Sequence, residues 1–261
     1  MSLRLRDVTV RFGRVTALDE ASVDLEPRGV TAVIGPNAAG KSTLLRVLAG
    51  IQRLHGGAVS IGGVDLASIP VRERARRIGF LPQRGGVSGS FLTREVVGFG
   101  GFALASGRQG FRTVEAAIDA VGLTGEADRP LNQLSIGQQQ RAGLARALVQ
   151  VDPTEGGLLL LDEPFSAQDP LEIERIATIL DEFTAAGGGV VAAMHEIGVA
   201  WSVADHAVLL AGGAVIEAGE TEAVLSPSAL ESLFGTRFVD SAHGPVPASR
   251  RRIDASSGVD E

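Results

Sequence analysis

The stretch "GPNAAGKST" (residues 35–43) decides the fold of this chain. It follows the apolar run "TAVI", typical of a buried strand, and leads into "TLLRVLAG", whose apolar spacing and final glycine are typical of a helix. A Gly-rich turn between a strand and a helix aims successive backbone amides at phosphate oxygens. The sequence therefore predicts a phosphate-binding loop made of Gly35, Pro36, Asn37, Ala38, Ala39, Gly40, Lys41, Ser42 and Thr43.

The last side chains of this loop suit a nucleotide bound with Mg²⁺. Lys41 can reach the outer phosphates, and the Ser42 hydroxyl can bind the metal ion. An ordinary Gly-rich turn before a helix is the alternative interpretation. Because the strand, the spacing and the helix all match, the sequence favours nucleotide binding.

Two adjacent acids, Asp162 and Glu163, follow the apolar run "LLLL" (residues 158–161). Ligands of open α/β sheets collect at the carboxyl ends of the strands, so both acids are candidates for the same site. Adjacent side chains on a strand point to opposite sides, which gives the two acids different roles. We expect Asp162 to orient Mg²⁺ and Glu163 to polarise the water that attacks the outer phosphate. A solvated strand end is the alternative.

The composition excludes several classes of protein. The chain has 261 residues, 44% hydrophobic and 21% charged, which is typical of one large globular domain or two modest ones. The absence of cysteine excludes disulfide frameworks and thiolate metal sites, and the four scattered histidines argue against a metal cluster. A net charge of −7 argues against broad nucleic-acid binding.

The sequence contains no apolar run near the ~18 residues that span a bilayer, and its N-terminus has no apolar signal core. We therefore expect a protein that is made and kept in the cytoplasm. If it works at a membrane, a partner must supply the membrane-spanning part.

Alternating strand and helix patterns predict an α/β fold with a sheet covered on both faces. The stretch from about 86 to 155 is mostly helical and interrupts this alternation, so we expect an inserted helical lobe there. Residues 240–261 are rich in Pro, Ser and Gly, and we expect them to form a disordered tail. This leaves residues 1–239 as the folded domain.

Together with five further motifs, these residues resemble the ATP-binding subunit of ABC transporters over roughly residues 1–235. The stretch 35–43 resembles the Walker A motif, and "LLLLDEP" resembles Walker B with the catalytic glutamate. The five further motifs are Phe12 in "VRFG", Gln83 in "FLPQ", the signature "LSIGQQQR" (residues 134–141), the D-loop "SAQD" (residues 166–169) and the switch histidine His195 in "AAMHE".

This resemblance implies an α/β fold class: a P-loop NTPase core with a mixed sheet, an N-terminal antiparallel β subdomain and an inserted α-helical lobe. It also implies residue roles. Adenine would stack on Phe12. The catalytic residues would be Glu163, His195 and Gln83, and the Mg²⁺ site would use Ser42, Gln83 and Asp162.

The resemblance further implies a head-to-tail pair of copies. The signature of one copy, through Ser135, Gly137 and Gln138, would close over ATP bound to the other, and Asp169 would contact the second copy. The commonest signature has glycine where this chain has Ile136. We expect function to survive, because the Ser and the second Gly that face phosphate are retained.

Each of the further motifs has a structural alternative. Phe12 and His195 are also explained as core residues, and Gln83 as an ordinary loop residue that follows a proline. Asp169 precedes Pro170 and is also explained as a helix cap, a role that can coexist with a dimer contact.

Stretches outside the motifs, such as "VRERARRIGFLPQ" and "TREVVGFG", resemble the importers of iron–siderophore, haem and cobalamin. The resemblance implies an ATPase that uses ATP and Mg²⁺ to power such an importer. Its implied partners are transmembrane permease subunits, a second copy of itself and, indirectly, a substrate-binding protein, without nucleic acid.

The implied location is the cytoplasmic face of the cell membrane. We expect the Gly-rich stretch 85–101 to receive the permease; a plain surface loop is the alternative. Other importers, exporters and soluble ABC ATPases such as an iron–sulfur assembly factor remain alternative functions.

Overall fold

The computed structural model describes residues 2–25, 29–83, 89–104 and 110–248. Its centre is a six-stranded sheet in the order β10-β9-β3-β8-β7-β6, with β10 antiparallel to β9 and the other pairs parallel. This confirms the predicted mixed sheet. Its strands are β3 (Gly29–Ile34), β6 (Ile78–Leu81), β7 (Leu158–Asp162), β8 (Gly189–Ala193), β9 (His206–Ala211) and β10 (Ala214–Glu220).

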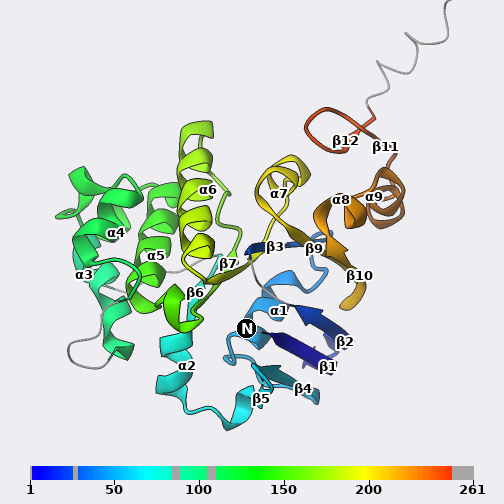
Figure 1. Cartoon of the computed structure of the whole chain (residues 1–261), viewed down its shortest axis with the longest axis horizontal. Helices are drawn as coiled ribbons and strands as arrows, with labels where there is room; N and C mark the ends of the chain where they lie inside the picture. Colours follow the sequence, from blue (N-terminus) through cyan, green and yellow to red (C-terminus); the bar gives the residue numbers. More distant parts are fainter. Residues whose placement is uncertain (1, 26–28, 84–88, 105–109, 249–261) are drawn as a thin grey trace, which may run out of the picture.

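Helices lie on both sides of this sheet (Figure 1). The α-helices are α1 (Lys41–Leu48), α2 (Val71–Arg77), α3 (Thr93–Gly98), α4 (Val114–Ala120), α5 (Ile136–Gln150), α6 (Pro170–Ala185), α7 (Ile197–Val203), α8 (Thr221–Val224) and α9 (Pro227–Phe234). The 3₁₀ helices are η1 (Leu66–Ser68), η2 (Phe99–Ala103), η3 (Thr124–Glu126), η4 (Leu131–Gln133) and η5 (Pro153–Glu155).

Successive residues of the central strands pack into two separate cores. In β7, Leu159 and Leu161 join the core that contains α5 and α6, whereas Leu158 and Leu160 join the core that contains α1. All four side chains are fully buried. A strand buried on both faces needs a continuous apolar sequence, which explains the run of leucines. Packing from both sides fixes the carboxyl end of the strand in place.

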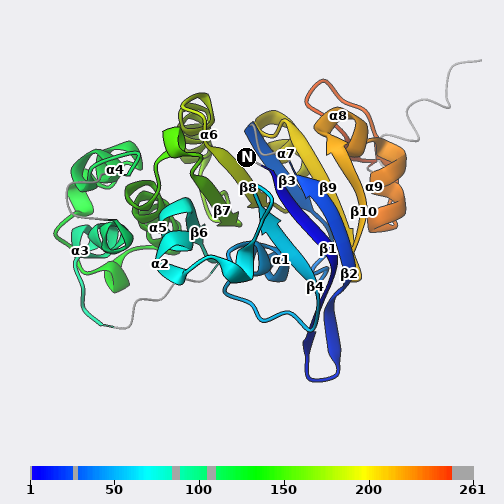
Figure 2. The ribbon, with the colours of Figure 1, turned by 60° about the horizontal axis from the view of Figure 1, so that its bottom comes forward.

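A second, four-stranded antiparallel sheet has the order β2-β1-β4-β5. Its strands are β1 (Leu3–Phe12), β2 (Val15–Leu25), β4 (Gly56–Ile61) and β5 (Val64–Asp65). In Figure 2, β1 and β2 project as a long hairpin beside α1. This sheet is the predicted N-terminal antiparallel subdomain, and it covers the core on the α1 side.

The described residues between β6 and β7 are helical, in agreement with the expected lobe, whose boundaries stay a prediction. The longest helix there, α5, anchors the lobe to the sheet. The Gln150 side-chain amide donates to the carbonyls of Ala75 (2.7 Å) and Ile78 (2.8 Å). At the other end of α5, Arg141 and Glu172 of α6 form an ion pair of 2.6 Å with little exposure.

The expected disorder from residue 240 is wrong for residues 240–248. Two short strands, β11 (Phe238–Val239) and β12 (Val246–Pro247), pair antiparallel there. Phe238 is buried, and Gly244 packs so tightly on Trp201 that an added Cβ would lie 2.5 Å from the indole. These two apolar contacts outweigh the polar composition of the segment. Residues 249–261 lie outside the described part of the chain.

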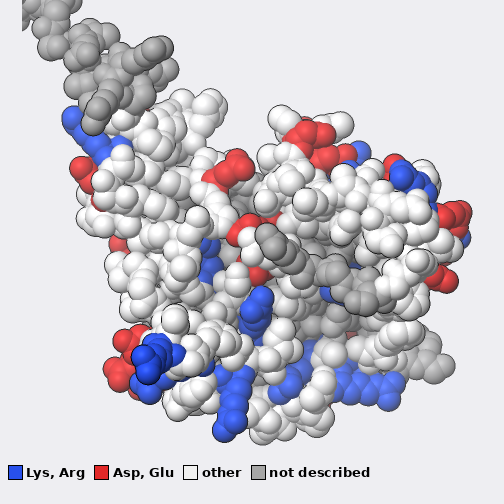
Figure 3. Space-filling view, turned by 180° about the vertical axis from the view of Figure 1, so that it is seen from behind, with Lys and Arg blue, Asp and Glu red and all other residues white. Residues whose placement is uncertain are grey.

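The face opposite to that of Figure 1 carries both signs of charge. Lys and Arg side chains gather along the lower edge of that view, and acidic side chains lie mainly above them or beside them (Figure 3). Among the described residues, no helix combines the length and the apolar character needed to cross a membrane.

The contacts of the C-terminal hairpin predict different outcomes for two truncations. Removing residues 240–261 uncovers Phe238 and Trp201, and we expect a loss of about 1–2 kcal/mol, a fall in Tm of roughly 3–8 °C. Removing only residues 249–261 should leave Tm unchanged. Thermal unfolding followed by the fluorescence of Trp201, the only tryptophan, measures both. Equal Tm values for the two truncations would contradict a stabilising role for the hairpin.

Candidate functional site

The phosphate-binding loop joins β3 to α1 at the carboxyl edge of the central sheet. Gly40 has a φ of 106°, and a Cβ there would lie 2.4 Å from the Ala17 carbonyl oxygen. A Cβ on Gly35 would lie 2.1 Å from the Leu210 carbonyl oxygen. Glycine is therefore required at both positions, because the backbones of β2 and β9 press on the loop.

Lys41, the first residue of α1, is the only lysine among the 24 basic Lys and Arg residues of the chain. Its buried ammonium donates to the carbonyls of Gly35 (2.6 Å) and Pro36 (3.0 Å). A site formed by these two close carbonyls suits a compact ammonium better than a planar guanidinium. Burial lowers the pKa of Lys41, and the negative charges of Glu163 and Asp162 oppose that shift.

Ser42 and Asp162 meet although 120 residues separate them in sequence. The Ser42 hydroxyl donates to Asp162 Oδ1 over 3.0 Å. Burial raises the pKa of the Asp162 carboxyl, while the bond from Ser42 and the backbone of Gln83 favour its charged form. The other oxygen, Oδ2, is buried without a well-directed hydrogen bond from the described residues. A buried carboxylate oxygen that lacks a well-directed hydrogen bond is suited to bind a cation.

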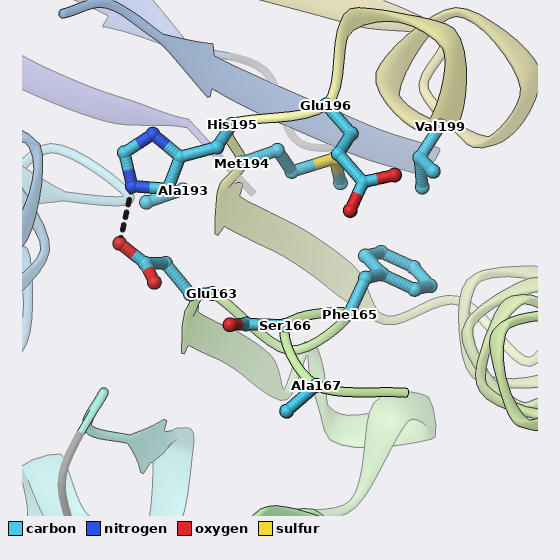
Figure 4. A pocket seen from close by; sticks show the side chains of 9 residues that line it. All are labelled: Glu163, Phe165, Ser166, Ala167, Ala193, Met194, His195, Glu196 and Val199. Carbon is cyan, nitrogen blue, oxygen red and sulfur yellow. Dashed lines mark hydrogen bonds and ion pairs between the residues drawn. The ribbon is translucent and has the colours of Figure 1, made fainter. Parts of the chain in front are cut away.

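Glu163 follows β7 with a left-handed backbone, φ 58°. Its amide donates to the Ala193 carbonyl (3.0 Å), and its own carbonyl accepts a bond from the Gln140 side-chain amide (3.0 Å). These contacts turn its side chain toward His195, and Glu163 Oε1 and His195 Nε2 form a close hydrogen bond (Figure 4). The pair places an acid beside an imidazole at the end of β8.

Lys41, Ser42, Glu163 and His195 line one cavity of about 350 Å³, and Asp162 lies behind Ser42 without lining it. At its mouth lies Phe12, which is 48% exposed and therefore not the core residue of the alternative interpretation. Gln83 also lines the cavity. The full lining is Phe12, Val15, Thr16, Ala17, Asn37, Ala38, Ala39, Gly40, Lys41, Ser42, Thr43, Gln83, Glu163 and His195.

A smaller cavity of about 100 Å³ lies on the other side of the Glu163–His195 pair. Phe165, Met194 and Val199 supply its apolar wall, and Ser166 and Glu196 supply polar atoms (Figure 4). Glu163 and His195 thus line both cavities, and the D-loop residues Ser166 and Ala167 line only the smaller one.

No residue of the signature lines the large cavity of its own chain, although Gln140 bonds the backbone of Glu163. Ser135 and Gln138 form a reciprocal cap at the start of α5, with bonds of 3.0 and 3.2 Å. Gly137 packs on the D-loop, where the Gln168 amide donates to its carbonyl (3.1 Å). Asp169 caps α6 by accepting from the Glu172 amide (3.0 Å). The cap interpretation of Asp169 is therefore confirmed.

Sequence reasoning missed four contributors to the site. Val15, Thr16 and Ala17 line the cavity because β2 returns beside Phe12, a position that the hairpin pattern could have suggested. Gln140 supports the Glu163 backbone from the signature helix. Its place in the run "GQQQR" gave no signal for that contact.

Comparisons with known proteins agree with this geometry. Residues 18–166 match the family model described as ABC transporter. The hemin import ATP-binding protein HmuV of Rhizobium meliloti is 37% identical to this chain, in an alignment that covers 90% of this chain and 92% of that protein. HmuV of Pseudomonas entomophila is 38% identical, with 92% and 95% covered. A solved dimeric bacterial ABC transporter cassette is 25% identical with a TM-score of 0.73, covering 84% of this chain and 98% of its own.

The site around Lys41 predicts that Lys41→Ala weakens nucleotide binding by at least about tenfold, because the charged donors to the outer phosphates are lost. Lys41→Arg should not restore the affinity, since a planar guanidinium does not match the two carbonyls that hold the ammonium. The control is Arg53→Ala, which removes an exposed positive charge beyond the end of the same helix, outside the cavity lining, and should bind normally. A fluorescent ATP analogue measures the affinity. Normal binding by Lys41→Ala would remove the phosphate-loop assignment.

Proposed function

The chain belongs to the ABC transporter family and is an ATPase of that family, and on this basis we propose that it powers an importer of haem or a related metal chelate. The observation that carries the ATPase chemistry is the convergence of three parts in one cavity. These are the buried ammonium of Lys41, the Ser42 hydroxyl with Asp162 bonded behind it, and the Glu163–His195 pair.

The cavity suits ATP from end to end. Phe12 offers an exposed ring face for adenine at the mouth. At the other end, the loop amides and the start of α1 supply partial positive charge, and Lys41 supplies a full one. This positive charge would attract the anionic phosphate chain of ATP to that end of the cavity.

Glu163 is the proposed general base for hydrolysis. Its carboxylate would accept a proton from the water whose oxygen attacks the outer phosphorus, while the bond to the leaving ADP oxygen breaks. His195 holds that carboxylate in place through their hydrogen bond. Gln83, which lines the same cavity, would orient the water.

The donor set also fits Mg²⁺, which prefers oxygen ligands. Asp162 Oδ2 is buried without a well-directed partner, and the Ser42 hydroxyl lies 3.0 Å from the other oxygen of Asp162. These two residues, with Gln83, would hold the ion. Mg²⁺ would neutralise charge on the outer phosphates.

The phosphate side of the cavity would be closed by a second copy. In the proposed sandwich, Ser135, Gly137 and Gln138 of one copy face the ATP held by the other. The separation of the signature from its own cavity supports this arrangement, as does the likeness to a dimeric cassette. Asp169, the last residue of the D-loop, would contact the second copy. Splitting the donors between copies makes hydrolysis depend on closure.

The remaining partners follow from an import system. A permease would span the membrane and dock on the lobe side of this chain, and a substrate-binding protein would deliver cargo to the permease. This places the ATPase at the cytoplasmic face of the membrane. The docking stretch expected at residues 85–101 lies partly outside the described residues.

The proposed cargo is haem or a related chelate, because the matched relatives are named as hemin import ATP-binding proteins over nearly their full length. The cargo does not touch this chain, so its residues carry no chemistry that distinguishes haem from a siderophore complex or cobalamin. An ATPase of another importer or exporter, or a soluble iron–sulfur assembly ATPase, is the alternative.

Co-purification and reconstitution distinguish these functions. The proposed function predicts recovery with a multi-span membrane protein, and ATPase activity in vesicles that rises when the binding protein is loaded with haem. Stimulation by another cargo and not by haem would overturn the cargo assignment. Recovery with soluble assembly proteins alone would overturn the transport role.

The role of Glu163 predicts that Glu163→Gln keeps ATP binding but lowers turnover by about 10²–10⁴-fold, because the proton acceptor is lost while the shape is kept. ATP should then trap a dimer, detected by light scattering. Glu196→Gln is the matched control, since Glu196 lies next to His195 but lines only the small cavity. Normal turnover by Glu163→Gln would contradict its role as the base.

A further inference from the structure

Ile136 is the first residue of α5 and 71% exposed. The residues on both sides of Ile136 in the sequence are fixed by close contacts. Ser135 before it and Gln138 after it cap the helix reciprocally. Gly137 packs so closely on the D-loop that a Cβ there would lie 2.6 Å from the Ala167 carbonyl oxygen.

A single exposed isoleucine needs no explanation by itself. The second observation is an apolar rim at the mouth of the nucleotide cavity. Phe12 and Val15, the residues on either side of the β1–β2 turn, are 48% and 66% exposed, and both line that cavity. The rim and the signature are separate surfaces of one chain, since Ile136 is not part of the cavity lining.

Strand β2 connects the rim with the phosphate-binding loop. Val15 is two residues from Ala17, whose carbonyl oxygen presses on Gly40 of the phosphate-binding loop. Two residues of strand span about 7 Å. Val15 therefore lies near the loop that the signature of a second copy would approach in the proposed sandwich.

We propose that Ile136 of one copy packs on Val15 of a second copy when the ATP sandwich closes, beside the Phe12 ring that adenine would cover. The inference rests on the proposed function, because that arrangement puts Ser135 and Gly137 of one copy at the phosphates of the other. Ile136 stands between these two residues and enters the mouth of the same cavity. The contact adds apolar surface that a glycine at this position would not supply.

The partner is thus a second copy of this chain, and the contact occurs twice in a symmetric dimer. The phosphate contacts of the signature are electrostatic and weaken with salt. The Ile136 contact is apolar and should not weaken with salt.

The test measures the dissociation constant of the ATP-bound dimer in the Glu163→Gln background. Ile136→Gly and Ile136→Thr should each weaken the dimer by about tenfold, because both lose apolar contact in two places. Ile136→Val should stay within about threefold of the parent. Thr keeps the β-branched, restricted backbone, so it separates contact from backbone freedom.

Val71→Gly is the matched control, because Val71 is also the first residue of a helix and is 72% exposed. It should leave the dimer unchanged. In a double-mutant cycle with Val15→Thr, the effects of Ile136→Thr and Val15→Thr should be less than additive.

Normal dimerisation by Ile136→Gly and Ile136→Thr would overturn this inference and leave the proposed sandwich standing. Tighter dimers would show that Ile136 obstructs closure, and weakening by Gly alone would show a backbone effect; each overturns it. The inference would also be overturned if the Ile136 variants changed the recovery of the permease and left the dissociation constant of the dimer unchanged. A parent that forms no dimer with ATP would overturn the proposed sandwich itself, and with it this inference.

Discussion

The structure depends on burying an ammonium and a carboxylate at one edge of the sheet without pairing them to each other. Lys41 donates to two carbonyls of its own loop, and Asp162 accepts from the Ser42 hydroxyl. Burial lowers the pKa of Lys41 and raises that of Asp162, so both charges are costly until a ligand arrives. In the proposed function, a phosphate chain with Mg²⁺ would supply the opposite charge to each of these groups.

Such a site needs a rigid frame. The parallel strands provide it by packing alternate side chains into two cores, so that neither face of β7 is free to shift. The carbonyls of Ala17 and Leu210 leave room only for glycine in the loop. On the lobe side, the Gln140 amide holds the carbonyl of Glu163. The signature helix is therefore bonded directly to the backbone of the proposed base.

The sequence predicted the parts of this site that depend on local spacing or on sheet topology. The loop from Gly35 to Thr43 follows from its glycines, and the meeting of Ser42 and Asp162 follows from the rule that parallel strands end at one edge. It did not predict the left-handed backbone of Glu163, because that conformation depends on packing across three elements. The short helix α7 and the C-terminal hairpin were also missed. The hairpin is stabilised by the burial of Phe238 and the packing of Gly244 on Trp201, which composition does not reveal.

The central claim is that one working site needs residues from two copies. Mixing two inactive variants tests it most directly. Lys41→Ala removes the phosphate loop function, and Ser135→Asp keeps a helix cap while placing a negative charge at the partner's phosphate. A mixed dimer then contains one intact composite site, so the mixture should recover up to about a quarter of the normal ATPase rate, since half of random dimers are mixed and one of their two sites is intact. A mixture no more active than the average of its two components would contradict the account.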